Sequence, residues 1–157
     1  MPCCRWRTGT TTPWPPSAEA AAIPVSAIEL PARLEAVGDA GDWMAAWLAP
    51  RAVPAETVFA MRLCLEEVLA NIAMHGNSRG VSIALAEEPG RLVLSIGDDG
   101  PPFDPVTADL PEGQEIGGNG LLLLRRYCSD LVYHREGERN RLTLGFSVPG
   151  GNPAPGK

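Results

Sequence analysis

The sequence is poor in aromatic residues, in positive charge and in long apolar runs. Aromatic side chains make up 6% of the 157 residues, so a core must be built mainly from aliphatic side chains. Lys and Arg number 13 against 19 Asp and Glu, a net charge of -6, which argues against general nucleic-acid binding because a row of phosphates would not be neutralised. No run of 18 apolar residues and no basic amphipathic segment occurs, so neither a membrane-spanning nor a membrane-surface protein is expected.

Cysteine is also scarce, with four residues and no Cys-x-x-Cys spacing. This pattern argues against a zinc site or a thioredoxin-type motif. Residues 1–24 lack the apolar stretch of a secretory signal. We therefore interpret Cys64 and Cys128, which lie in apolar helical patterns, as small core side chains of a cytoplasmic protein.

Glycine (17 residues) and proline (16 residues) are abundant, but they are concentrated in particular segments. Residues 1–24 hold five prolines and no hydrophobic periodicity, which predicts a disordered tail. Residues 97–120 hold six glycines and four prolines, and so long a loop inside a compact domain is usually functional. One folded domain is expected over residues 25–149, followed by a flexible end at 150–157.

Alternating and helical hydrophobic patterns predict the elements of this domain. Strands are expected at 25–30, 80–86, 91–96, 131–134 and 141–148, and helices at 32–48, 54–75 and 121–129. Their order predicts an α+β protein in which helices cover one face of a mixed, mostly antiparallel sheet.

Helical spacing also predicts which faces of the two longer helices are buried. The helix at 54–75 has a clear apolar stripe, and Gly76 is expected to end it: Val58, Met61, Leu65, Val68, Leu69 and Ile72. The helix at 32–48 has a weaker stripe, in which two positions have alternatives: Leu34, Val37, Trp43 or Met44, and Trp47 or Leu48. Gly38 and Gly41 weaken this first helix, so its early turns are expected to be irregular.

Three clusters of residues could carry chemistry. On the helix at 54–75, Glu67 and Asn71 are four residues apart and project from one face, where a carboxylate and an amide could hold a divalent metal ion. A solvated polar helix face is the alternative for this pair. Asp98 and Gly100 follow an apolar strand, where an acid could accept a hydrogen bond from a ligand and a glycine allows close approach; a charged turn is the alternative.

The third cluster is the glycine-rich run from Gly117 to Gly120, which leads directly into the predicted helix at Leu121. Free backbone N–H groups at a helix start favour the binding of phosphate, and a flexible hinge is the alternative. The three clusters occur in a fixed order, each at the end of a predicted element where one ligand could meet all of them.

At these motifs the sequence resembles the GHKL ATPase superfamily, which has the Bergerat ATP-binding fold, and within it the anti-sigma regulatory factor (serine/threonine protein kinase) branch. The resemblance covers residues 26–148. LEEVLANIAMHG is similar to the N box of that family, IGDDGPPFDP to its G1 box, and GGNGLLLLRRYCSDLVYHREGERNRLTL to its G2 box and closing strands. It implies a two-layer α/β sandwich with a short ATP lid.

The resemblance implies a role for each matching residue. Glu67 would be the general base that accepts a substrate hydroxyl proton, and Asn71 would bind the Mg²⁺ ion that bridges the ATP phosphates. Asp98 would accept from the adenine amino group, with Gly100 leaving room for the ring. The lid and the helix start behind it would wrap the phosphates: Gly118, Asn119, Gly120 and Leu121.

Two further positions follow from the resemblance. Thr143, on a late strand, would lie beside the adenine water network, and His75 would approach the phosphates, although a role at the helix end explains His75 equally. Two residues depart from the pattern of the superfamily. Pro102 stands where a second G1 glycine is common, and Asn119 stands where a basic residue is common between the lid glycines.

The resemblance implies an ATP- and Mg²⁺-dependent serine/threonine protein kinase that acts as a partner switch in the cytoplasm, as a homodimer. It would phosphorylate an anti-anti-sigma (STAS-type) protein in one state and sequester a sigma factor or a similar target in the other. Two alternatives remain open: a non-catalytic ATP-binding module that only binds a protein partner, and an α/β domain that binds no nucleotide.

Overall fold

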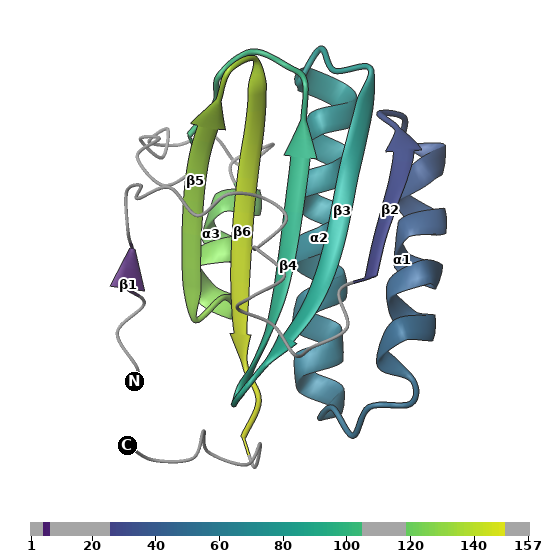
Figure 1. The fold of residues 1–157 in the computed structure, drawn as a ribbon, viewed down its shortest axis with the longest axis vertical. Coiled ribbons are helices and arrows are strands. Elements are labelled where there is room, and N and C mark those ends of the chain that lie inside the picture. The colour runs from purple at the N-terminus through teal and green to yellow at the C-terminus, as the bar shows by residue number, and fades with distance from the viewer. Residues whose placement is uncertain (1–4, 7–25, 105–118, 150–157) are drawn as a thin grey trace.

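A six-stranded sheet forms one layer of the molecule and three helices form the other (Figure 1). The computed structural model describes residues 5–6, 26–104 and 119–149. The strands, in chain order, are β1 (Arg5–Trp6), β2 (Ser26–Pro31), β3 (Gly80–Glu88), β4 (Arg91–Asp98), β5 (Asp130–Glu136) and β6 (Arg139–Ser147). The helices are α1 (Glu35–Leu48), α2 (Ala55–His75) and α3 (Asn119–Tyr127).

The strand order across the sheet is β1-β5-β6-β4-β3-β2. All neighbours pair antiparallel except β1 and β5, which are parallel. Two hairpins, β3–β4 and β5–β6, turn through Gly90 and Gly137, whose positive φ angles of 75° and 58° suit glycine. The predicted fold class, an α+β protein with helices on one face of a mixed, mostly antiparallel sheet, is confirmed.

The core lies between the helices and the sheet and is almost entirely aliphatic, as expected. Alternate residues of β4 and β6 face the helices, which bury the large apolar side chains of both strands. Phe146 is the one aromatic side chain among the fully buried residues that the structure describes. Cys64 and Cys128 are free thiols in this core, which confirms their assignment as small core residues.

Helix α2 runs behind the centre of the sheet (Figure 1) and buries the predicted stripe, with Val58 and Ile72 only partly covered. It ends at Gly76, as predicted, but Gly76 keeps a right-handed conformation. The reversal falls one residue later, at Asn77, whose φ is 50°. Asparagine tolerates this region better than most residues do. The chain then enters β3, whose first residues lie beside the last residues of β4.

Helix α1 differs from its prediction. It begins at Glu35 because the preceding residues are engaged elsewhere: the N–H of Ala32 donates to the carbonyl of Arg79, next to β3. Leu34 was expected in the core, but it precedes the helix and is 55% exposed. The buried row is Ala36, Ala40, Met44 and Leu48, so the second alternative was right at both uncertain positions.

Two other expectations meet limits. The predicted tail at 1–24 lies outside the described residues except for β1. There Arg5 and Trp6 form a short strand that pairs with β5. The expected end at 150–157 lies outside them as well. Among the described residues, no helix combines the length and the apolar character needed to cross a membrane.

Candidate functional site

A cavity of about 460 Å³ opens between α2, the start of α3 and the sheet. Its volume is in the range of small-molecule sites. Apolar walls come from each layer: Val68 and Ile72 on α2, Leu124 on α3, and Ile96 and Leu142 on the sheet. Polar groups stand at two ends of it, which suits a ligand with a flat apolar part and charged substituents.

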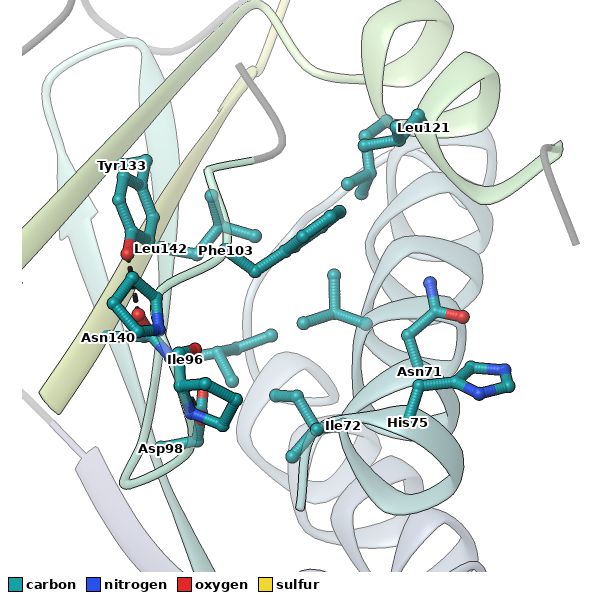
Figure 2. A pocket seen from close by; sticks show the side chains of 15 residues that line it. Asn71, Ile72, His75, Ile96, Asp98, Phe103, Leu121, Tyr133, Asn140 and Leu142 are labelled. Atoms are coloured by element: carbon teal, nitrogen blue, oxygen red, sulfur yellow. Dashed lines mark hydrogen bonds between the residues drawn. The ribbon is translucent and has the colours of Figure 1, made fainter. Parts of the chain in front are cut away.

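Figure 2 shows how the polar groups are divided. Asn71 and His75 project from α2 on one side, and Asp98 and Asn140 lie on the sheet side. Phe103, in the loop after β4, extends between the two sides towards Leu121 at the start of α3. Asn71 from the first sequence cluster and Asp98 from the second therefore line one cavity, together with Leu121, the residue that follows the third cluster.

Asp98 is the buried carboxylate of this cavity, with 8% of its surface exposed. It is the last residue of β4, and its parity within the strand turns it towards the helix layer. Three donors reach its Oδ1 atom: the Ser78 hydroxyl at 2.8 Å, the Gly100 N–H at 2.8 Å and the Asn140 amide nitrogen at 3.1 Å. The carboxylate is thereby held in one orientation at the cavity.

The neighbouring carboxylate, Asp99, plays a different part. It is exposed, and its Oδ1 accepts the backbone N–H of Arg79 at 2.8 Å and of Gly80 at 3.5 Å. These backbone donors lower the pKa of Asp99 below its ordinary value. Asp99 thus joins the end of β4 to the start of β3, and Asp98 alone serves the cavity.

Gly100 is required by packing against the protein itself. A β-carbon at this position would overlap the carbonyl oxygen of Gly76 and lie 2.6 Å from Ser78 Oγ. The residue does not line the cavity, whereas Pro101 does. The space that Gly100 leaves is occupied by the end of α2 and the turn after it, and this holds the loop close to the helix.

Glu67 and Asn71 lie one turn apart on α2 and both reach the start of α3. A β-carbon on Gly120 would stand 3.2 Å from Glu67 Oε2 and 3.2 Å from Asn71 Nδ2. Asn71 lines the cavity, and Glu67 lies just before it on the helix. Carboxylate and amide oxygens are the donors that Mg²⁺ prefers, with water and phosphate completing its shell, so this pair fits such an ion.

The remaining predicted residues are placed as follows. His75 is exposed at the last turn of α2 and lines the cavity, and Leu121 lines it from the first turn of α3. Helix α3 begins at Asn119, two residues earlier than predicted, so Asn119 and Gly120 belong to its first turn. Gly118 lies outside the described residues.

Thr143 is not part of the cavity. It pairs with Ser95 across β4 and β6, and the two hydroxyl oxygens are 3.5 Å apart on the face of the sheet away from the helices. Asn140, which is directly opposite Asp98 in the register, occupies the place expected for Thr143. The parity of β6 explains the correction, because Thr143 alternates with the buried Leu142 and Leu144.

The sequence predictions did not include Asn140 and Tyr133, which line the cavity, or Arg135, which donates to Asn140. A signal was present for Asn140. It occupies the same set of alternate positions along β6 as Leu142 and Leu144, so it is a polar residue on the face of the strand that faces the core. Tyr133 donates to Asn140 at 2.6 Å, and burial raises the pKa of its hydroxyl, so it remains protonated and a donor at neutral pH.

A buried carboxylate in an apolar slot, with hard oxygen donors beside a helix start on the other side, is an arrangement that suits a nucleotide-binding domain. A family model described as the histidine kinase-like ATPase domain matches residues 30–146. The chain belongs to this family, and its ATP-binding class follows from that membership. The expected GHKL resemblance is confirmed.

A curated relative is the serine/threonine-protein kinase BtrW of Bordetella bronchiseptica, which is 32% identical over 96 residues, 55% of this chain and 68% of that protein. A solved structure, that of the RsbU and RsbW domains of Rv1364c from Mycobacterium tuberculosis, matches 80% of this chain with a TM-score of 0.58 and 20% identity. This chain spans about a third of that structure, 32%. The likeness supports the fold.

Proposed function

We propose that this protein is an ATP-dependent serine/threonine protein kinase that works as a partner switch. The observation that carries the proposal is that Glu67, Asn71 and Gly120 lie together, and that Asn71 and Asp98 line one cavity. Binding of ATP without catalysis needs only a site for adenine and a site for the phosphates. A carboxylate beside the phosphate end supplies what a kinase needs in addition.

The chemistry divides among the residues of this chain. ATP supplies the γ-phosphoryl group, with Mg²⁺ held by Asn71 and neutralising the phosphates. Glu67 accepts the proton of a substrate hydroxyl as the hydroxyl oxygen forms a bond to phosphorus and the bond to the ADP oxygen breaks. The N–H groups in the first turn of α3 would bind phosphate oxygens, because a helix start favours negative charge.

The substrate in this proposal is a serine or threonine of an anti-anti-sigma (STAS-type) protein, and the second partner is a sigma factor or a similar regulatory target. The relative named as a serine/threonine-protein kinase supports the choice of reaction. We further propose a cytoplasmic homodimer. A module that binds ATP and a partner without catalysis is the second candidate, and it has no use for Glu67.

The test is transfer of labelled phosphate from ATP, with Mg²⁺, to a STAS-type protein encoded near this chain. The proposal expects label on a serine or threonine and a loss of about a hundredfold or more in the Glu67→Gln variant. Glu66→Gln is the matched control, because this neighbouring carboxylate pairs at 3.0 Å with Arg62, whose guanidinium lies against Gly41 of α1.

The two candidates give different results. Binding of ATP without labelled partner in the wild type supports the non-catalytic module. Labelling that is equal in Glu67→Gln and Glu66→Gln removes Glu67 from the role of base. A rise in melting temperature on adding ATP measures binding separately, since a ligand of the native state stabilises it.

A further inference from the structure

The side-chain amide of Asn140 joins three parts of the site. It belongs to β6, it is 8% exposed, and its partners come from β4, from the loop after β4 and from β5. Figure 2 shows Asn140 and Tyr133 linked beside Asp98 at the sheet end of the cavity. None of the roles proposed above uses this amide.

The orientation of the amide is fixed by its partners. Its Oδ1 atom accepts from the Tyr133 hydroxyl at 2.6 Å and from Arg135 Nη1 at 3.0 Å, two groups that donate here. Its Nδ2 atom faces acceptors: Asp98 Oδ1 at 3.1 Å, the Pro101 carbonyl at 2.8 Å and the Gly100 carbonyl at 3.3 Å. A flipped amide would set oxygen against oxygen on one side and donor against donor on the other.

This amide decides which oxygen of Asp98 can receive a ligand. With Asn140, Ser78 and Gly100 all donating to Oδ1, that oxygen is saturated. No hydrogen bond between described residues reaches Oδ2. One acceptor of known direction is therefore left for a ligand at the apolar slot.

The amide also holds the wall of the slot. Arg135 Nη1 donates to the Gly100 carbonyl at 2.7 Å, and Asn140 shares that carbonyl and takes the next one, at Pro101. Pro101 lines the cavity. The carboxylate and the loop beside it are therefore kept at a fixed separation by one side chain and the two residues that orient it.

We propose that Asn140, oriented by Tyr133 and Arg135, is the positioning residue that makes this cavity select adenine over guanine, acting through Asp98. The inference rests on the proposed nucleotide binding. Adenine carries an amino group, a donor, at the position where guanine carries a carbonyl oxygen. A single acceptor of fixed direction can accept from the adenine amino group but repels the guanine carbonyl oxygen. The second pairing is unfavourable because it leaves buried polar groups without a partner.

The test compares the dissociation constants of ATP and GTP, each with Mg²⁺, for the full chain and its variants by calorimetry. The wild type is expected to prefer ATP. Asn140→Ala is expected to raise the dissociation constant of ATP about tenfold and to leave that of GTP nearly unchanged. The ratio of the two constants, which measures the preference for ATP, should therefore fall. Tyr133→Phe removes one of the two groups that orient the amide. It is expected to reduce the preference for ATP over GTP by a few-fold.

Tyr127→Phe is the matched control, because the other tyrosine packs on α3 against Phe59, away from the cavity, and its loss should leave the preference unchanged. An unchanged ratio in both Asn140→Ala and Tyr133→Phe overturns the inference while nucleotide binding stands. So does an equal loss of ATP and GTP binding, which indicates general loosening. A wild type that binds neither nucleotide overturns the proposed function and this inference together. Tyr133→Phe keeps the test decisive if Asn140→Ala does not fold.

Discussion

A β-carbon on Gly120 would lie 3.2 Å from the Glu67 carboxylate, closer than most packed carbons come to oxygen. The first turn of α3 therefore rests against the residue proposed as the general base. Glu67 is half-buried on a helix surface and can shift by a few tenths of an ångström. The position of α3 and the position of the base are accordingly coupled through one glycine.

Gly120→Ala tests this coupling. Alanine favours a helix by up to about 1 kcal/mol over glycine, and the crowding opposes it, so the free energy of unfolding should change by less than about 1 kcal/mol. Phosphate transfer should fall by about tenfold, because the displaced Glu67 and the added methyl disturb geometry at the reacting end. Urea unfolding and the transfer assay measure the two effects. A large loss of stability with normal transfer per folded molecule contradicts the coupling.

Asn71→Ala should reduce the dependence of ATP binding on Mg²⁺. Asn71 lines the cavity and is exposed to it, so its removal costs little stability and deletes one hard oxygen donor. The shift in melting temperature with ATP, measured with Mg²⁺ and with chelator, should differ in the wild type and become nearly equal in the variant. A variant that retains the full Mg²⁺ effect shows that the ion is held elsewhere. Glu66→Gln serves as the control on the same helix.

Cys64 and Cys128 have sulfur atoms 3.9 Å apart in the core, and they should resist thiol reagents in the native protein. Both are buried, at 0% and 3% exposure. In a variant that lacks Cys3 and Cys4, a colorimetric thiol titration should show no fast reaction until denaturant is added. Fast reaction of either thiol without denaturant contradicts the packing.

Cys64→Ser places a hydroxyl in the same fully buried position and should lower the free energy of unfolding by about 1–3 kcal/mol. Cys64→Ala is the matched comparison, because it removes the sulfur without adding a polar group. Chemical denaturation of the two variants measures the difference. If serine is tolerated better than alanine, the surroundings of Cys64 are more polar than the structure indicates.

Burial raises the pKa of Tyr133 above the ordinary phenol value near 10, an effect to which Asp104 and Asp98 add. The folded state therefore resists ionisation more than the unfolded state does. The resulting stability is fully present below pH 10 and is lost as the pH rises beyond it. Tyr133→Phe should flatten the fall in unfolding free energy above about pH 10. A Tyr133→Phe variant whose pH profile equals that of the wild type contradicts the assignment.

Much of the fold follows from short-range patterns in the sequence. The hairpins have glycine at the turns that need positive φ, and α2 has an apolar stripe long enough to be unambiguous. The placement of Asn71 and Asp98 at one cavity could also be predicted, because Asp98 ends its strand and Asn71 lies in the last two turns of its helix. The start of α1 could not, because a sheet contact at Ala32 competes with the helix there.

The sheet end of the cavity was harder to predict because it depends on the register of the strands. Asn140 meets Asp98 only because β6 pairs with β4 in one particular alignment. Tyr133 and Arg135 meet Asn140 only through the alignment of β5 with β6. A shift of one residue would reverse every side chain to the other face. The parity of Leu142 and Leu144 was visible, and it already placed Thr143 away from the helices.

The position of β6 has a consequence for how the protein is made. Strand β6 follows β5 in the chain, yet it lies between β4 and β5 in the sheet. During synthesis, α2 and the β3–β4 hairpin leave the ribosome first, with Glu67, Asn71 and Asp98 already present. Asn140 follows Asp98 by 42 residues, and β5 is connected to β4 in the sheet only through β6. A nascent chain halted before β6 would carry Glu67, Asn71 and Asp98 and still lack the wall of the cavity that Asn140 and Leu142 form.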